Sequence, residues 1–326
     1  MTISVALCTY NGERFIREQI ESILNQTMPV NEIVVCDDGS TDNTLTIIEE
    51  YQGTTSTNIR IYRNKHNMGF LRNFEQAINL CHNGLVFLSD QDDIWMPHKV
   101  EAIVRWFDDN PQMECVFTDA ELINSDGKPM GKRLWDALPF FKSDQRRFDH
   151  GKVFAVLIRG NVATGATMAL RKDGEMFFAD ICEQHNMKFH DSYLALHYAH
   201  RQTLGKITEQ LIYYRIHAGQ QTGISEKPID YYGIDWDVPT SLSINSSLYG
   251  KNNNKKIAAH RRLIDLRHRS KYKLFGWLIV LFHIHQYIYI YHWRWFGCIL
   301  YDQKTSLEHS WERIKSKIHA SQVTNK

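Results

Sequence analysis

The stretch that decides the fold reads Ile33-Val34-Val35-Cys36-Asp37-Asp38-Gly39-Ser40-Thr41-Asp42. Four consecutive apolar residues are typical of a fully buried strand, as in a parallel sheet covered by helices on both faces. The change to acidic and turn-forming residues ends this strand and places carboxylates after it. We therefore expect an α/β fold whose functional loops lie at the carboxyl ends of the strands.

The same alternation of apolar runs and helix-period segments continues on both sides of this stretch. Apolar runs predict strands at residues 3–7, 33–36, 59–61, 85–88 and 115–118. Stripes of apolar residues at helical spacing predict helices near residues 15–24, 45–51, 70–81 and 100–107. This βαβαβαβαβ progression predicts a Rossmann-like, mostly parallel sheet flanked by helices.

A second acidic loop follows the strand predicted at 85–88 and reads Ser89-Asp90-Gln91-Asp92-Asp93-Ile94-Trp95. Both acidic loops are expected at the same edge of the sheet, where their charges repel one another unless a cation joins them. Oxygen ligands suit Mg²⁺ or Mn²⁺. Solvated turns with helix caps would give the same two patterns, because Asp and Ser are favoured at such positions.

Length and composition limit the classes of protein that need to be considered. The 326 residues are 43% hydrophobic, which is enough for one large domain or one domain with an appendage. A formal charge of +1 gives no global field toward nucleic acid, so a nucleic-acid partner is not expected. The six cysteines are scattered singly, which favours core thiols in a reducing compartment. No secretory leader is recognisable before the first strand, and we expect a cytoplasmic protein.

The second half of the chain is less regular. Strands are expected near residues 153–157 and 166–170, a helix at 190–200 and a strand at 210–214. We interpret residues 1–240 as one domain with a regular half, 1–120, and a less regular half, 121–240. The Ser- and Asn-rich residues 241–254 are interpreted as a linker.

Residues 255–326 are predicted to form a helical, aromatic-rich extension. A basic segment over 255–273 precedes an aromatic stretch over 274–300, which His283, His285 and Arg294 interrupt. Because charge inside a membrane is costly, a helix lying in the headgroup region explains this composition better than a span. The alternative is that these helices pack on the catalytic domain or form an interface between copies of the chain.

Several motifs in this order resemble inverting family-2 glycosyltransferases with the GT-A fold, in particular the bacterial surface-polysaccharide branch labelled rhamnosyl- or glucosyltransferase-like. The resemblance covers residues 3–223. Besides the two acidic loops, it rests on Cys8-Thr9-Tyr10-Asn11-Gly12-Glu13, Leu24-Asn25-Gln26-Thr27, Asn67-Met68-Gly69, Arg72-Asn73, His190-Asp191 and Tyr214-Arg215-Ile216-His217. Together these motifs make a specific signal.

The resemblance implies that residues 1–240 are a GT-A catalytic domain, in which 1–120 bind the nucleotide sugar and 121–240 form the acceptor-side half. It also implies roles for individual residues. Binding of the nucleotide sugar is implied for Thr9, Tyr10, Glu13, Asp38, Asn67, Arg72, Asp90 and Arg215. Asp38 would bond the base, and Asp90-Gln91-Asp92 matches the family's DXD motif. Asp92 would bind Mn²⁺ or Mg²⁺ directly, with Asp90 and His217 as further metal ligands. For His217, a structural histidine is the alternative.

Asp191 matches the position of the family's catalytic base. The usual Glu-Asp or Asp-Asp pair is replaced here by His190-Asp191. A carboxylate in the first turn of an amphipathic helix gives the same pattern when it only caps the helix. Catalysis and capping therefore both remain open for Asp191 at this point.

The resemblance implies a metal-dependent hexosyltransferase that uses UDP-glucose or another UDP-hexose, with a dTDP-L-rhamnose-dependent rhamnosyltransferase as the alternative. The acceptor would be a saccharide on polyprenyl diphosphate during O-antigen, lipopolysaccharide or capsule synthesis, at the inner face of the cell membrane. A sugar-1-phosphate nucleotidyltransferase would need a Gly-rich basic loop after the first strand, which residues 8–13 lack. A non-catalytic, sugar-nucleotide-binding membrane scaffold is the remaining class, and a homo-oligomer is compatible with each.

Overall fold

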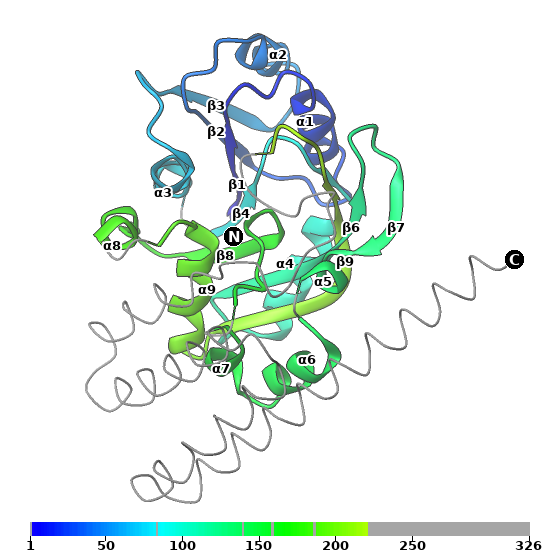
Figure 1. Ribbon diagram of the computed structural model, residues 1–326. Helices are drawn as coiled ribbons and strands as arrows, with labels where there is room; N and C mark the ends of the chain where they lie inside the picture. The colour runs from blue at the N-terminus through cyan, green and yellow to red at the C-terminus, as the bar shows by residue number, and fades with distance from the viewer. Residues whose placement is uncertain (1, 83, 139, 158–159, 185–186, 221–326) are drawn as a thin grey trace, which may run out of the picture. The chain divides into compact units, whose positions relative to one another are not determined.

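Four parallel strands form the first half of the sheet in the computed structural model (Figure 1), which describes residues 2–82, 84–138, 140–157, 160–184 and 187–220. They lie in the order β3 (Asn58–Arg63), β2 (Glu32–Asp37), β1 (Thr2–Thr9) and β4 (Gly84–Ser89). All neighbours in this group pair in parallel. Residues 37–42 and 90–95 therefore meet at one edge, as the sequence predicts.

The second half of the sheet is mixed. The order continues through β8 (Met168–Lys172), β6 (Cys115–Ile123), β9 (Leu204–Arg215) and β5 (Ile94–Trp95), and β7 (Pro129–Arg133) pairs with β6. Strand β8 is antiparallel to both β4 and β6, and β6 and β9 pair in parallel. Strand β8, which comes later in the chain, thus lies between β4 and β6, the strands predicted as the fourth and fifth. The sheet remains largely parallel.

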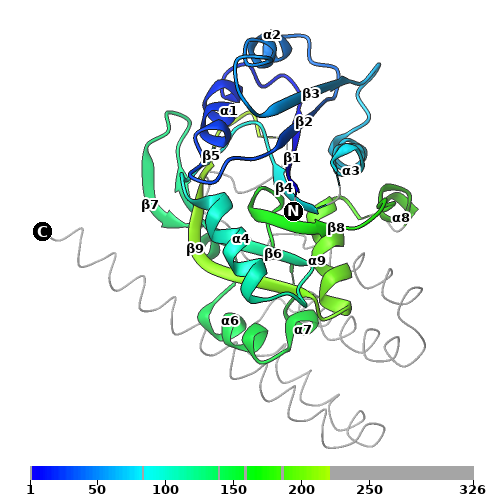
Figure 2. The ribbon, with the colours of Figure 1, turned by 180° about the vertical axis from the view of Figure 1, so that it is seen from behind.

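Helices cover the parallel half on both faces. Figures 1 and 2 show α3 (Phe70–Leu80) on one side of β1–β3, with α1 (Ile16–Leu24) and α2 (Thr44–Glu49) on the other. The apolar stripes of α1 and α3 are buried against the sheet, as their periodicity predicts. The remaining described helices are α4 (Lys99–Asp109), α5 (Leu134–Ala137), α6 (Lys142–Asp149), α7 (Val153–Leu157), α8 (Ala179–Gln184) and α9 (His190–His200).

Two predictions for the second half need correction. The apolar run at 153–157 is the short helix α7, because a five-residue apolar run does not by its pattern distinguish a helix from a strand. It packs on α9 rather than joining the sheet. The strand predicted at 166–170 begins only at Met168, because Gly165–Thr167 form the 3₁₀ turn η1.

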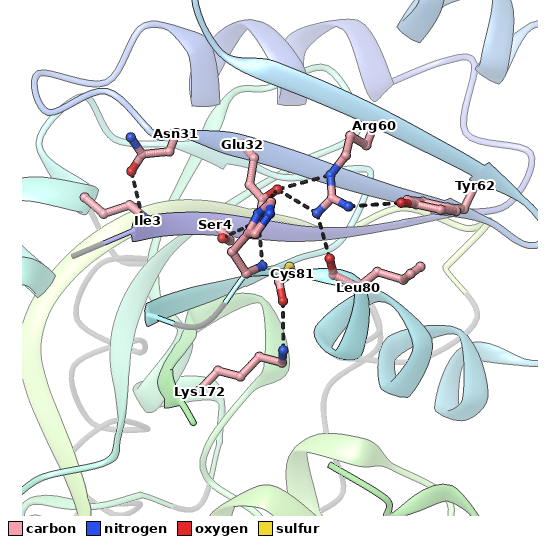
Figure 3. A network of polar contacts seen from close by, with 10 residues as sticks. Ile3, Ser4, Asn31, Glu32, Arg60, Tyr62, Leu80, Cys81 and Lys172 are labelled. Atoms are coloured by element: carbon pink, nitrogen blue, oxygen red, sulfur yellow. Dashed lines mark hydrogen bonds and ion pairs between the residues drawn. The ribbon is translucent and has the colours of Figure 1, made fainter. Parts of the chain in front are cut away.

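A network of polar contacts joins β1, β2 and β3 near their amino ends (Figure 3). The buried carboxylate of Glu32 accepts hydrogen bonds from Ser4 Oγ at 2.6 Å, Arg60 Nη2 at 2.6 Å and the His82 amide at 2.8 Å. Arg60 also donates to the Leu80 carbonyl at 2.6 Å. Burial opposes ionisation of Glu32, but the hydrogen bonds outweigh it and hold its pKa below the usual value.

Residues 2–140 and 144–220 of the described part belong to one compact unit. The predicted linker at 241–254 and the extension at 255–326 lie outside the described residues. Among the helices that the structure describes, none combines the length and the apolar character needed to cross a bilayer. The described cysteines are free and buried, as expected of core thiols.

Candidate active site

Two buried aspartates at the end of β2, Asp37 and Asp38, form hydrogen bonds within the following loop and with neighbouring loops. Asp37 accepts hydrogen bonds from Thr9 Oγ1 at 2.9 Å and from the Ser40 amide at 2.9 Å. Thr9, implied as a nucleotide contact, is buried, and its hydroxyl is engaged by Asp37. Asp37 and Thr9 therefore fix the turn that begins the acidic loop.

Asp38, implied as the partner of the base, is buried and accepts hydrogen bonds from three donors. These are Asn64 Nδ2 at 2.9 Å, the Met68 amide at 2.8 Å and the Gly69 amide at 2.9 Å. The Asn67 side chain also accepts from the Gly69 amide, at 3.0 Å. The structure thus brings Asp38 and Asn67 together, and their carboxylate and amide hold the 64–69 loop in place.

Gln91 was not among the residues implied for the site, yet it joins two of its loops. Its Nε2 donates to the Tyr10 carbonyl at 3.0 Å, and its Oε1 accepts from the Tyr10 amide at 2.8 Å. A side chain on Gly12 would collide with Gln91, since a Cβ there would lie 2.2 Å from Gln91 Oε1. The middle position of the DXD motif is the only sequence signal that could have found this residue.

Two of the implied nucleotide contacts are engaged elsewhere. Glu13 is exposed and accepts from the Asn43 amide at 2.9 Å, at the start of α2. Arg72 forms ion pairs with Asp180 at 2.8 Å and Glu183 at 2.6 Å, both on α8. The structure therefore places Glu13 and Arg72 in contacts with neighbouring helices.

Arg215 anchors the DXD loop from the end of β9. Its amide donates to Asp93 Oδ1 at 2.9 Å, its Nε donates to the Asp92 carbonyl at 2.7 Å, and its guanidinium pairs with Glu18 at 2.5 Å. The Arg215 residue is only 1% exposed. The buried guanidinium holds the Asp92 carbonyl, and the Arg215 backbone amide holds the side chain of Asp93.

His217 lies against Asp92, with Nε2 at 2.8 Å from Asp92 Oδ2. Its Nδ1 accepts a hydrogen bond from the Gly219 amide at 3.2 Å. This assigns the neutral tautomer with the proton on Nε2, donated to Asp92. Direct metal binding through Nε2 would move the proton to Nδ1 and break the Gly219 bond.

The carboxylates around the DXD loop are crowded. Burial and then the charges of Asp92 and Asp191 raise the pKa of Asp90 to about 7, while Lys99 acts in the opposite direction. Burial likewise raises the pKa of Asp93 well above its usual value, and its Oδ2 has no hydrogen-bond partner among the described residues. In the same part of the chain, no hydrogen bond reaches the Asp90 carboxylate. Among the described residues, the donors in contact with these carboxylates therefore leave Asp93 Oδ2 and both oxygens of Asp90 without a hydrogen bond.

The residues at this edge fit a divalent cation of the Mg²⁺ type. In the described residues, no group of three or more His, Cys, Asp and Glu side chains is placed to hold a metal alone. Mg²⁺ and its substitutes commonly bind through one or two carboxylates together with substrate phosphates. The free Asp90 carboxylate and the partly exposed Asp92 supply such a donor set.

Asp191 lies in the first turn of α9, after the N-cap residue Phe189. Its Oδ2 accepts from the Gly165 amide at 3.1 Å, and its Oδ1 accepts from the Ser192 amide at 2.6 Å. Burial raises the pKa of Asp191 to about 6, although these hydrogen bonds act in the opposite direction. Asp191 thus contacts the first turn of its own helix and a second segment, η1, and its charge acts on Asp90.

His190, beside Asp191, is buried and stacks on Phe74 with ring centroids 3.9 Å apart. Neither ring nitrogen has a hydrogen-bond partner among the described residues. Burial lowers the pKa of His190 to about 3, so the imidazole is neutral near pH 7. His190 therefore fixes the start of α9 by packing and cannot replace the missing carboxylate of the acidic pair.

Residues 4–161 match the sequence model of the family described as glycosyl transferase family 2. An uncharacterized glycosyltransferase of Haemophilus influenzae is 28% identical over 277 residues, which cover 78% of this chain and 82% of that protein. The dTDP-rhamnosyl transferase RfbG of Shigella flexneri is 39% identical over 102 residues, covering 30% of this chain and 35% of the relative.

Solved structures give the fold. The crystal structure of S. aureus TarS 1-349 in complex with UDP-GlcNAc matches with a TM-score of 0.53 at 18% identity, covering 80% of this chain and 71% of that one. At this identity the likeness concerns the fold alone. The mostly parallel sheet flanked by helices is that of GT-A glycosyltransferases.

Proposed function

Because residues 4–161 belong to glycosyl transferase family 2, we propose that the chain transfers a hexose from a nucleotide sugar to a saccharide acceptor during surface-polysaccharide synthesis. The observation that carries this proposal is the group of under-satisfied carboxylates around Asp90, on which the charge of Asp191 acts. Clustered, desolvated carboxylates destabilise a fold, so their presence at the ligand-binding edge supports a catalytic use.

Each residue of the cluster has a separate task in this proposal. Asp92 and Asp90 would hold the cation, and His217 keeps Asp92 in position through the 2.8 Å contact. When bound, Mn²⁺ or Mg²⁺ would neutralise the negative charge of the departing nucleoside diphosphate. Gln91 keeps the loop containing Tyr10 against the DXD loop, so that donor and cation sites form together.

Asp191 is the proposed general base. It accepts the proton of the acceptor hydroxyl as the oxygen attacks the anomeric carbon, and the bond to the diphosphate breaks on the opposite side. One such displacement inverts the anomeric centre. A pKa of about 6 leaves most Asp191 ionised near pH 7, yet basic enough to accept a proton.

Two donor classes follow from this proposal. A UDP-hexose such as UDP-glucose is the first candidate. The second is dTDP-L-rhamnose, which the 39% identity to a dTDP-rhamnosyl transferase supports over 102 residues. We place the acceptor sugar on polyprenyl diphosphate.

The test is donor hydrolysis by the purified full chain, with Mn²⁺ and a panel of UDP- and dTDP-sugars. Wild type should release nucleoside diphosphate from one donor, and Asp92→Asn should not. Nucleotide binding without turnover of any donor would favour the non-catalytic scaffold instead. Release by Asp92→Asn at the wild-type rate would contradict the assignment of the cluster.

We further propose that residues 255–300 hold the enzyme on the inner leaflet of the cell membrane. The support is compositional: a Lys/Arg run, worth ~1 kcal/mol per residue near an anionic surface, precedes a Trp- and Tyr-rich stretch. Full-length chain should float with anionic liposomes at low salt and be partly released by high salt. Failure to float would favour the alternative, in which the extension packs on the catalytic domain or between copies of the chain.

A further inference from the structure

The two-residue segment Gly165-Ala166 in η1 lies between α4 and α9 and is bonded to both. The Gly165 amide donates to Asp191 Oδ2 at 3.1 Å. The next residue, Ala166, accepts a hydrogen bond at its carbonyl oxygen from Lys99 Nζ at 3.0 Å. The first residue of α4 is thereby connected to the first turn of α9 through a single stretch of backbone.

Lys99 is an unusual residue to find at this position. It is fully buried, and its ammonium lies 3.8 Å from the centroid of the Trp95 ring. Among the described residues it forms no ion pair, and Ala166 is the one acceptor of its hydrogen bonds. Burial lowers its pKa to about 7, against the charges of Asp93 and Asp90. Burying an ammonium that contacts no carboxylate costs free energy, and this cost suggests that its bond to Ala166 has a functional role.

The same segment is restrained from its other side by His190. A Cβ on Gly165 would lie 2.7 Å from His190 Nε2. The His190 ring is itself fixed by stacking on Phe74. Gly165 therefore lies between Ala166, which accepts the Lys99 hydrogen bond, and the His190-Asp191 pair. A residue with a side chain at this position would collide with the His190 ring.

We propose that Lys99 is a positioning residue for Asp191, acting through the Gly165-Ala166 backbone. The inference rests on the proposed role of Asp191 as the general base. Loss of the ammonium would release the Ala166 carbonyl and weaken the Gly165 bond that stabilises the ionised carboxylate. The Asp191 pKa then rises, and less base is ionised at a given pH.

Other groups also act on Asp191. Asp90 at the end of β4 and Tyr214 on β9 interact with it electrostatically, and His190 is its neutral neighbour on α9. Ser192 donates to it from within the helix. Of these groups, Asp90 also responds to Lys99, whose charge lowers the Asp90 pKa. A change in the Asp191 titration therefore reports on the Gly165 bond only when exchange at the Gly165 amide changes with it.

The chain supplies a matched control in Lys172. It is also buried, and its Nζ donates to the Cys81 carbonyl at 2.8 Å, near the opposite end of the sheet (Figure 3). Lys99→Met and Lys172→Met each remove a buried bond between an ammonium and a carbonyl. A merely structural role for Lys99 predicts the same phenotype for both variants.

The first measurement is the pH profile of transfer by the full chain. Lys99→Met should lower kcat roughly 10- to 100-fold, leave the donor KM within about twofold, and move the acid limb of the profile to higher pH. Lys172→Met should keep the wild-type limb. An unmoved limb in Lys99→Met, or an equal shift in both variants, overturns the proposal.

The second measurement does not depend on activity. Hydrogen exchange at the Gly165 amide should speed up in Lys99→Met and remain as in wild type in Lys172→Met. Gly165→Ala would bring a methyl group against His190 while Lys99 stays intact. Its Gly165-site amide should exchange as fast as in Lys99→Met, and this variant replaces Lys99→Met in the test if Lys99→Met does not fold. If wild type turns over no donor, the proposed function fails, while unchanged exchange at Gly165 in Lys99→Met would still overturn the positioning role by itself.

Discussion

Carboxylates lie near both ends of the parallel strands, and the hydrogen bonds around them differ between the two ends. At the amino end, Glu32 is met by Ser4, Arg60 and the His82 amide, and its pKa is lowered. At the carboxyl end, Asp90 receives no hydrogen bond from the described residues, and its pKa is raised. The carboxylate at the amino end is satisfied by protein groups, whereas the Asp90 carboxylate at the other end accepts no hydrogen bond from the described residues.

This contrast separates groups that serve the fold from groups that serve a ligand. A satisfied carboxylate such as Glu32 stabilises the native state. An under-satisfied cluster destabilises it, and a divalent cation would offset the charge of the carboxylates and stabilise the native state when it binds. The comparison predicts that substitutions at the two ends separate activity from stability.

The largest effect is expected for Asp92→Asn. Loss of one carboxylate charge from the DXD loop should abolish transfer, and excess EDTA should do the same to wild type. The variant should keep wild-type thermal stability or gain some, because like-charge repulsion falls. Full wild-type activity in EDTA would show that the carboxyl end needs no divalent cation.

The next largest effect is expected for Asp191→Asn, which keeps the shape of the side chain and removes the base. The kcat should fall by roughly 10²–10⁴ with little change in donor affinity. In wild type the base must be ionised, so kcat should rise with pH through about 6 and then level off. Near-normal turnover by the variant would leave Asp191 as a helix-capping residue.

Ligand binding at the carboxyl end should stabilise the protein by a predictable amount. UDP or dTDP at a hundredfold its Kd should add ~2.7 kcal/mol to the free energy of unfolding, and only when Mn²⁺ is present. Thermal denaturation with and without metal measures this, with Asp92→Asn as the control. No shift with either nucleotide would count against a nucleotide site.

Glu32→Gln should affect stability and leave kcat unchanged. Removing this partner of Arg60 should cost about 2 kcal/mol, because the Arg60 side chain is partly exposed and solvent reduces the loss. Since the folded pKa of Glu32 lies below its unfolded value, its contribution is present above pH ~4.3 and is lost as pH falls through the folded pKa. When denaturation is measured from pH 7 to pH 3, the free energy of unfolding should fall less in the variant than in wild type.

The parallel half of the fold could be predicted from the sequence because its signals are local. Each apolar run over β1, β2 and β4 predicts a buried strand, and the acidic residues after β2 and β4 predict the edge that the two loops share. The helix predicted at 190–200 is likewise α9. The insertion of β8 between β4 and β6 and the helix α7 were not predictable in this way, since both depend on packing partners distant in the chain.

The sequence by itself determined the parallel strands of the first half, the common edge of the two acidic loops and the family resemblance. Periodicity and motif spacing are properties of residues close together in the chain, so no tertiary contact is needed to recognise them. Only the tertiary structure decided which polar groups are satisfied. Arg215 reaches Asp93 across 122 positions, and Lys99 reaches Ala166 across 67. Burial and hydrogen bonding set each pKa, and both arise from contacts between segments that are far apart in the sequence.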